Sequence, residues 1–122
     1  MTLLVRDEED IIRENIEFHL AQGVDFLIAT DNLSKDGTTD ILHSFEQQGV
    51  LKYLFEESDD YNQHAWVTRM ARMASIEYKA DWIINNDADE FWWPVHGSLK
   101  TTFESIPNEF NTLLAQRSDF IA

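Results

Sequence analysis

The chain has 122 residues, 43% of them hydrophobic and 12% aromatic, which is enough to bury the core of one folded domain. Nine basic and 23 acidic residues give a formal net charge of −14, which disfavours a nucleic-acid or anionic-membrane surface. Cysteine is absent, so disulfides and thiolate metal sites are excluded. No apolar run reaches transmembrane length and Met1–Val5 is too short for a signal peptide, so we expect a cytoplasmic protein without a transmembrane segment.

Apolar stretches alternate with helical patterns along most of the chain. Ile12, Ile16 and Leu20 at helical spacing predict a first helix, which Gly23 is placed to cap. The strands that we expect are Thr2–Val5, Val24–Ala29, Val50–Phe55 and Asp81–Asn86, and the further helices are Thr38–Gln48 and Gln63–Tyr78. Beyond Pro94 the pattern weakens to a short helix over Leu99–Ile106 and the start of a strand within Asn111–Ala122.

This alternation predicts an α/β fold with a mostly parallel sheet and helices on both faces. Ligands of such sheets bind beyond the carboxyl ends of the strands, where Asp31, Asn32 and Asp87 are expected to lie. The chain ends in an uncapped apolar stretch, from which we expect a domain truncated at its C-terminus.

Asp87-Ala88-Asp89 follows the apolar run Trp82-Ile83-Ile84 and is the strongest candidate for a metal site. Alternate residues of an extended segment point the same way, so both carboxylates can converge on one hard cation such as Mn²⁺ or Mg²⁺. The alternative is a pair of solvated carboxylates in a turn, which is the more common use of such a string. The upstream residues favour the metal interpretation.

Asp31 opens a polar loop that runs to Thr38 and links a predicted strand to a helix, where side chains can hold a base, a ribose or a phosphate. The alternative is turn chemistry, to which we assign Asp36, Gly37 and Thr38. Arg69 or Arg72 is suited to neutralising a diphosphate, although a surface ion pair is the default for either. No glycine-rich dinucleotide or P-loop motif and no serine elbow occurs in the chain.

Three segments together resemble the GT-A glycosyltransferases of the large family 2 type, in particular a bacterial branch with an Asp-Ala-Asp-Glu-Phe-Trp string. They are Val5–Glu9, Asp31–Thr38 and Trp82–Trp92. The resemblance implies a Rossmann-like GT-A nucleotide-diphospho-sugar transferase fold. It also divides the single partial domain, 1–122, into a donor-binding part, 1–94, and an incomplete acceptor-side part, 95–122.

The same resemblance implies a role for each matching residue. The backbone of Val5 and Arg6 would line the base pocket, and Asp31 would contact the base or ribose of a nucleotide-diphosphate sugar donor. Arg69 would lie near the diphosphate. Asp89 would bind Mn²⁺ or Mg²⁺ directly, and Asp87 would contact the ribose or reach the metal through water.

The implied reaction is metal-dependent transfer of a sugar, with inversion, to an unknown sugar, lipid or protein acceptor. A carboxylate base is expected downstream of Ala122, and Glu90 is not assigned that role. Two alternatives are a domain that keeps this fold without catalysis and an enzyme that shares only the metal chemistry. A non-catalytic domain would bind nucleotide or a partner without turnover, whereas a nucleotidyltransferase would need a basic, glycine-rich loop in place of Arg6-Asp7-Glu8-Glu9.

Overall fold

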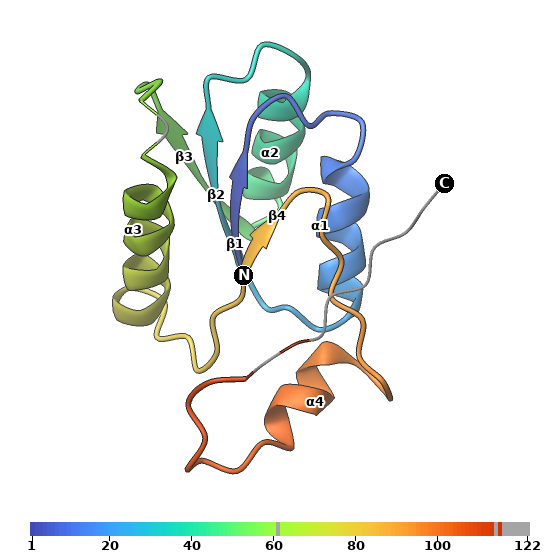
Figure 1. Ribbon diagram of the computed structural model, residues 1–122. Helices are drawn as coiled ribbons and strands as arrows, with labels where there is room; N and C mark the ends of the chain where they lie inside the picture. The colour runs from blue at the N-terminus through green and yellow to red at the C-terminus, as the bar shows by residue number, and fades with distance from the viewer. Residues whose placement is uncertain (61, 114, 116–122) are drawn as a thin grey trace.

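A computed structural model describes residues 1–60, 62–113 and 115 of the chain, and its centre is a four-stranded parallel sheet (Figure 1). The strand order is β3-β2-β1-β4. This Rossmann-like α/β arrangement confirms the predicted fold class. In chain order the elements are β1 (Thr2–Val5), α1 (Ile12–Ala21), β2 (Leu27–Asn32), α2 (Thr38–Gln47), β3 (Leu51–Glu56), α3 (Gln63–Ile76), β4 (Asn85–Asp87) and α4 (Leu99–Glu104).

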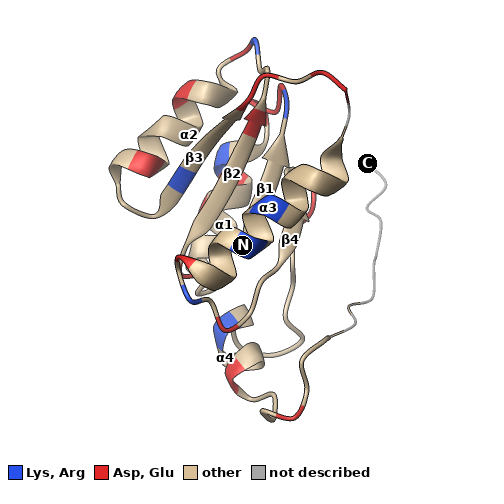
Figure 2. Cartoon of the chain, turned by 90° about the vertical axis from the view of Figure 1, so that its left-hand side faces the viewer, with Lys and Arg blue, Asp and Glu red and all other residues tan. Residues whose placement is uncertain are grey.

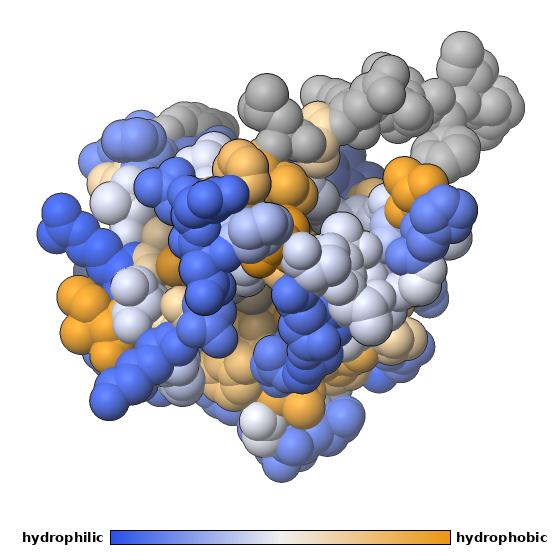
Figure 3. All heavy atoms as spheres, turned by 90° about the horizontal axis from the view of Figure 1, so that it is seen from below, coloured by the Kyte–Doolittle hydropathy of each residue, from blue (hydrophilic) through white to orange (hydrophobic). Residues whose placement is uncertain are grey.

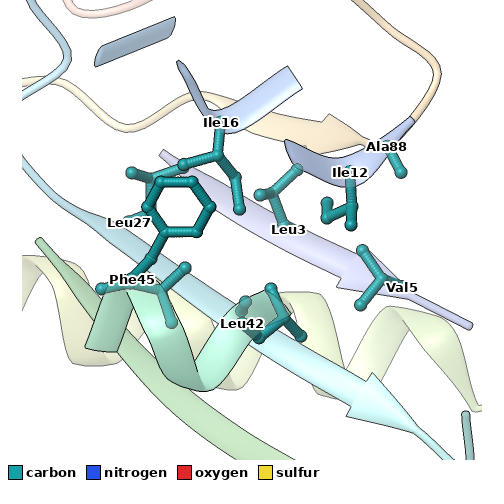
Figure 4. Close-up of a cluster of buried hydrophobic side chains, with 10 residues drawn as sticks. Leu3, Val5, Ile12, Ile16, Leu27, Leu42, Phe45 and Ala88 are labelled. Atoms are coloured by element: carbon teal, nitrogen blue, oxygen red, sulfur yellow. The ribbon is translucent and has the colours of Figure 1, made fainter. Parts of the chain in front are cut away.

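Helices cover both faces of the sheet, because β1 and β2 carry apolar side chains on both sides. Leu3 and Val5 join Leu27 in a core cluster that α1 and α2 complete (Figure 4). Leu4 packs toward the opposite face, in a smaller cluster with Ile28 and with side chains of α3. Strands that are buried on both faces are typical of parallel sheets, as the near-continuous apolar runs predicted.

The winding of the chain reverses once, and this reversal is at β1. The strands β1, β2 and β3 follow one another in a single direction across the sheet, after which α3 leads the chain back to place β4 on the other side of β1. The topological switch point therefore lies between β1 and β4. In open α/β sheets the carboxyl ends of the strands at this point are where ligands bind.

The fourth strand is shorter than predicted and begins later. Instead of Asp81–Asn86, β4 covers only Asn85–Asp87, because its partner β1 begins at Thr2, which aligns with Asn85. The apolar residues before it are only partly buried, and Trp82 packs its ring against Phe103 of α4, 5.1 Å away between centroids.

The last predicted strand is not seen in 111–113 and 115, and the rest of Asn111–Ala122 lies outside the described residues. In the part of the chain that is described, no helix is long and apolar enough to cross a membrane.

A cleft of about 880 Å³ lies at the amino ends of the strands, between the sheet and α4 (Figure 3). Its lining mixes apolar and charged side chains, among them Phe26, Tyr78, Trp82, Lys100 and Phe103. This end of the sheet is opposite to the carboxyl edge at which the predicted site residues lie. The cleft therefore takes no part in the candidate site.

Gly23 ends α1 as predicted. Its N–H donates to the carbonyl of Leu20 and the N–H of Val24 donates to that of His19, the pattern of a Schellman cap, and Gly23 has φ +91°. A Cβ at this position would lie 2.5 Å from Cβ of Lys100.

We expect Gly23→Ala to lower the free energy of unfolding by more than Gly49→Ala. Gly49 also has a positive φ, +80°, but a Cβ there would meet no atom within 4 Å. Gly49→Ala should therefore cost only the left-handed backbone term, about 1 kcal/mol, while Gly23→Ala adds the clash with α4. Urea unfolding of both variants measures the difference. Equal losses would mean that α4 does not pack against the end of α1.

Candidate functional site

The register of the sheet brings the predicted site residues to one edge. Val5 is aligned with Asp31 of β2, and Leu4 is aligned with Asp87 of β4, so all three strands end at nearly the same level. Neighbouring strands lie about 4.8 Å apart, which puts the backbones of Asp31 and Asp87 about 10 Å apart across β1. The loop that begins at Arg6 lies between them.

Asp87 and Asp89 point to solvent because of a turn and not because of an extended strand. β4 ends at Asp87, and the N–H of Glu90 donates to the Asp87 carbonyl at 3.0 Å, which closes a turn over residues 87–90. Ala88 is 2% exposed and joins the main core cluster, near Ile12 (Figure 4). The predicted extended geometry is wrong beyond Asp87, yet the expected result, Ala88 inward and both carboxylates outward, is observed.

The carboxylates of Asp87 and Asp89 differ from those of Asp7, Glu9 and Asp36 at the same edge. Acidic residues gather on the loops beyond the carboxyl ends of the strands (Figure 2). Among the described residues, none donates a hydrogen bond to either carboxylate of the turn, whereas Asp7, Glu9 and Asp36 all accept backbone N–H groups. Asp87 and Asp89 therefore have ligand capacity to spare, whereas Asp7, Glu9 and Asp36 are already engaged by backbone groups.

The raised pKa of Glu8 indicates that the electrostatic potential beside Asp87 and Asp89 is negative. Burial, followed by repulsion from Asp89, Asp10, Asp36 and Asp87, raises the pKa of the Glu8 carboxyl. Like charges raise a carboxyl pKa because they disfavour its ionised form. The potential at the turn is thus one that attracts a cation.

Hydrogen bonds between the β1–α1 loop and the β2–α2 loop give this edge a fixed shape. The N–H groups of Asp7, Glu8 and Glu9 donate to the side chains of Ser34, Thr38 and Asp36 respectively. In return Asp7 accepts the N–H of Lys35, at 2.6 Å, and Glu9 accepts that of Gly37, at 2.9 Å. The structural roles assigned to Asp36, Gly37 and Thr38 agree with these contacts.

Asp31 is 1% exposed and is fully engaged by protein groups. It accepts the hydroxyl of Tyr53 at 2.8 Å, the hydroxyl of Thr39 at 2.5 Å and the N–H of Ser34 at 3.2 Å. Burial and the Asp31 carboxylate raise the pKa of Tyr53 to about 12. The predicted contact of Asp31 with a base or ribose therefore requires a change in this arrangement, and it stays a prediction.

Two arginines of the predicted donor site, Arg6 and Arg69, are engaged in ion pairs. Arg69 of α3 contacts Glu56 at 3.2 Å, and Arg6 contacts Asp59 at 2.7 Å. The first pair joins α3 to the last residue of β3, and the second joins the β1–α1 loop to the loop after β3. About half of the Arg69 side chain stays accessible. The surface-pair alternative considered for Arg69 matches this contact, while its role toward a diphosphate remains a prediction.

The sequence model of one family, glycosyltransferase family 92, matches residues 1–117. The chain belongs to glycosyltransferase family 92. The resemblance to glycosyltransferases is thereby confirmed, but the matching family is 92 and not the family 2 type. No curated protein and no solved structure matches the chain.

This family 92 chain also contains a buried polar network that the sequence prediction missed. Asn15 and His19 of α1 are both 0% exposed and lie one helical turn apart, facing the turn that carries the carboxylates. Nδ2 of Asn15 donates to the carbonyls of Ala88 and Glu90, each at 2.8 Å. The available signal was the pair of polar residues at positions 15 and 19, on the helix face that Ile12 and Ile16 mark as buried.

We expect Asp31→Ala to destabilise this glycosyltransferase domain by about 3 kcal/mol, because the substitution leaves two hydroxyls and one N–H without their acceptor. Tyr53→Phe removes only one of these bonds and should cost about 1 kcal/mol. Denaturant unfolding of both variants gives the values. A stable Asp31→Ala protein would indicate that the carboxylate serves a ligand more than the fold.

Burial lowers the pKa of His19 to about 4 from its ordinary value of 6.5. As pH falls between these values the unfolded chain gains a proton that the folded chain does not take up. The free energy of unfolding should therefore fall by up to about 1.4 kcal/mol per pH unit from this group. We expect a weaker decline in His19→Gln, measured by urea unfolding at several pH values. Parallel curves for the two proteins would contradict the assignment.

Proposed function

We propose that this chain binds a nucleotide-diphosphate sugar at the carboxyl edge of its sheet and transfers the sugar, with inversion, to a sugar, lipid or protein acceptor. The proposal includes a divalent cation, Mn²⁺ or Mg²⁺, held by Asp89 and Asp87. It also includes a GT-A type of donor site. Membership of a glycosyltransferase family supports the reaction class.

The observation that carries the proposal is the position of the Asp87–Glu90 turn at the switch point of the sheet. β1 and β4 are the neighbouring strands between which the winding reverses, and the turn follows β4 directly. A nucleotide at this edge would meet the loop of Arg6 on one side and the two carboxylates on the other. This is the arrangement by which open α/β sheets hold nucleotides.

The residues of the turn fit a cation that is bound together with the donor. Within the described ranges no group of three or more His, Cys, Asp or Glu side chains is arranged to hold a metal. Mg²⁺ commonly takes only one or two carboxylates from the protein and completes its shell with phosphate oxygens and water. Asp87 and Asp89 have exposed carboxylates that accept no hydrogen bond from the described residues, so they would supply the one or two protein ligands of such an ion. We therefore expect weak binding of metal alone.

The chain's own residues would act by binding and orientation. Asp89 and Asp87 would hold the cation, which when bound stabilises the negative charge that develops on the departing nucleoside diphosphate. The backbone of Val5 and Arg6 would line the base pocket. The acceptor hydroxyl would form a bond to the anomeric carbon while the bond from that carbon to the diphosphate oxygen breaks. We assign the base for the hydroxyl proton to none of the described residues.

The test is calorimetric titration of UDP and GDP into the protein with and without Mn²⁺. We expect one nucleotide to bind at least about tenfold more tightly with the metal, and Asp89→Asn to remove that gain because it removes a charged oxygen ligand. Asp81→Asn is the matched control. It makes the same change of charge before β4, at the opposite end of the sheet, and should bind as the unmodified protein does.

Two results would separate the competing functions. Metal-dependent binding together with release of sugar from the matching nucleotide sugar would support the transferase. Metal-dependent binding without any turnover, in the presence of a panel of acceptors, would favour the non-catalytic domain. Equal nucleotide affinity with and without Mn²⁺ in a folded sample would overturn the proposed metal site.

A further inference from the structure

The turn that carries Asp87 and Asp89 is weakly supported by the sheet. β4 has three residues, and within the described part of the chain it lies at the sheet edge with β1 as its sole partner strand. A short edge strand cannot by itself fix the conformation of the residues that follow it. The position of the turn must come from contacts to another element, and α1 provides them.

Asn15 of α1 contacts the backbone carbonyls of three residues of the turn. Its Nδ2 donates two short hydrogen bonds, to the carbonyls of Ala88 and Glu90, and makes a longer contact of 3.4 Å with the Asp87 carbonyl. All three carbonyls therefore face α1. Because the backbone of the turn faces inward, the carboxylates of Asp87 and Asp89 are directed to solvent.

His19 closes the same network from the other side. Its Nε2 accepts the backbone N–H of Trp92 at 3.1 Å, so the proton of the neutral ring is assigned to Nδ1. Nδ1 then donates to the backbone carbonyl of Asn15 at 2.8 Å. The indole N–H of Trp92 donates to Oδ1 of Asn86 at 3.0 Å, and Asn86 donates to the Glu90 carbonyl at 3.1 Å.

We propose that Asn15 and His19 are positioning residues, which hold the Asp87–Glu90 turn in the one conformation that presents both carboxylates to a cation-bound nucleotide. The proposal rests on the proposed function, since it names what aligns that site. Neither side chain touches the ligand. Partners of this kind behind a metal ligand commonly change metal affinity by about 10- to 100-fold when they are substituted.

Two polar substitutions of His19 separate its two contacts. His19→Gln places an amide oxygen near the position of Nε2 and can still accept the Trp92 N–H. His19→Asn is shorter, so it keeps a donor beside Asn15 but loses the acceptor for Trp92. Asn15→Asp is an independent variant of almost unchanged shape, in which an oxygen replaces the donor that faces the two carbonyls. Leu42→Ala, in the core on α2, lowers stability but removes none of the hydrogen bonds that hold the turn.

The first readout is the ratio of nucleotide affinities with and without Mn²⁺, measured with whichever of UDP and GDP binds the unmodified protein. We expect this ratio to fall about tenfold in His19→Asn and Asn15→Asp and to be retained in His19→Gln and Leu42→Ala. A general loss of stability would not change the ratio. An unchanged ratio in both His19→Asn and Asn15→Asp would overturn the proposal.

The second readout needs no ligand. In the unmodified protein and in His19→Gln, the amide of Trp92 should be protected from hydrogen exchange, and in His19→Asn it should exchange at least about tenfold faster, as local opening predicts. Equal protection in His19→Asn would overturn the positioning role. If the unmodified protein shows no metal-dependent nucleotide binding, the proposed function fails, and the exchange data still decide whether His19 holds the turn.

Discussion

The structure depends on the burial of β1 between two parallel neighbours and two helical layers. Its four residues, Thr2–Val5, pair with β2 on one side and β4 on the other. Leu3 and Val5 pack in one core cluster and Leu4 packs against the other. Because the chain reverses its winding at this strand, loops from both halves of the sheet meet at its carboxyl end. The site residues, which are far apart in the sequence, are therefore brought together by the packing of one short apolar strand.

The acidic residues at the carboxyl edge of the sheet have two different roles. Asp7, Glu9 and Asp36 accept backbone N–H groups of neighbouring loops, so their charges stabilise the shape of the edge. Asp7 does so in a left-handed conformation, with φ +53°, which Asp and Asn adopt more readily than most residues. Asp87 and Asp89 accept no hydrogen bond from the described residues. A count of acidic residues cannot distinguish these uses, because the distinction lies in which backbone groups each carboxylate meets.

The sequence predicted most of the fold because the periodic patterns were strong, and its errors have physical causes. The helix at Thr38 and the strand at Thr2–Val5 were expected with bounds close to those observed. The strand expected over Asp81–Asn86 was displaced, because an apolar run does not reveal where its partner strand begins. The inward orientation of Ala88 was expected, whereas Asn15 and His19 were not, since their hydrogen-bond partners are backbone groups more than 70 residues away in the chain.

Electrostatics explains why a cation and a nucleotide would bind this site together. The edge is acidic and the whole chain carries a formal charge of −14, so a diphosphate alone is repelled. At an effective dielectric constant of about 20, two like charges 4 Å apart repel by about 4 kcal/mol. The nearby Arg6 and Arg69 are engaged by Asp59 and Glu56, which reduces the positive charge that they can offer. A divalent cation between the carboxylates and the diphosphate would turn this repulsion into attraction, and the turn held by α1 is where its charge would have to lie.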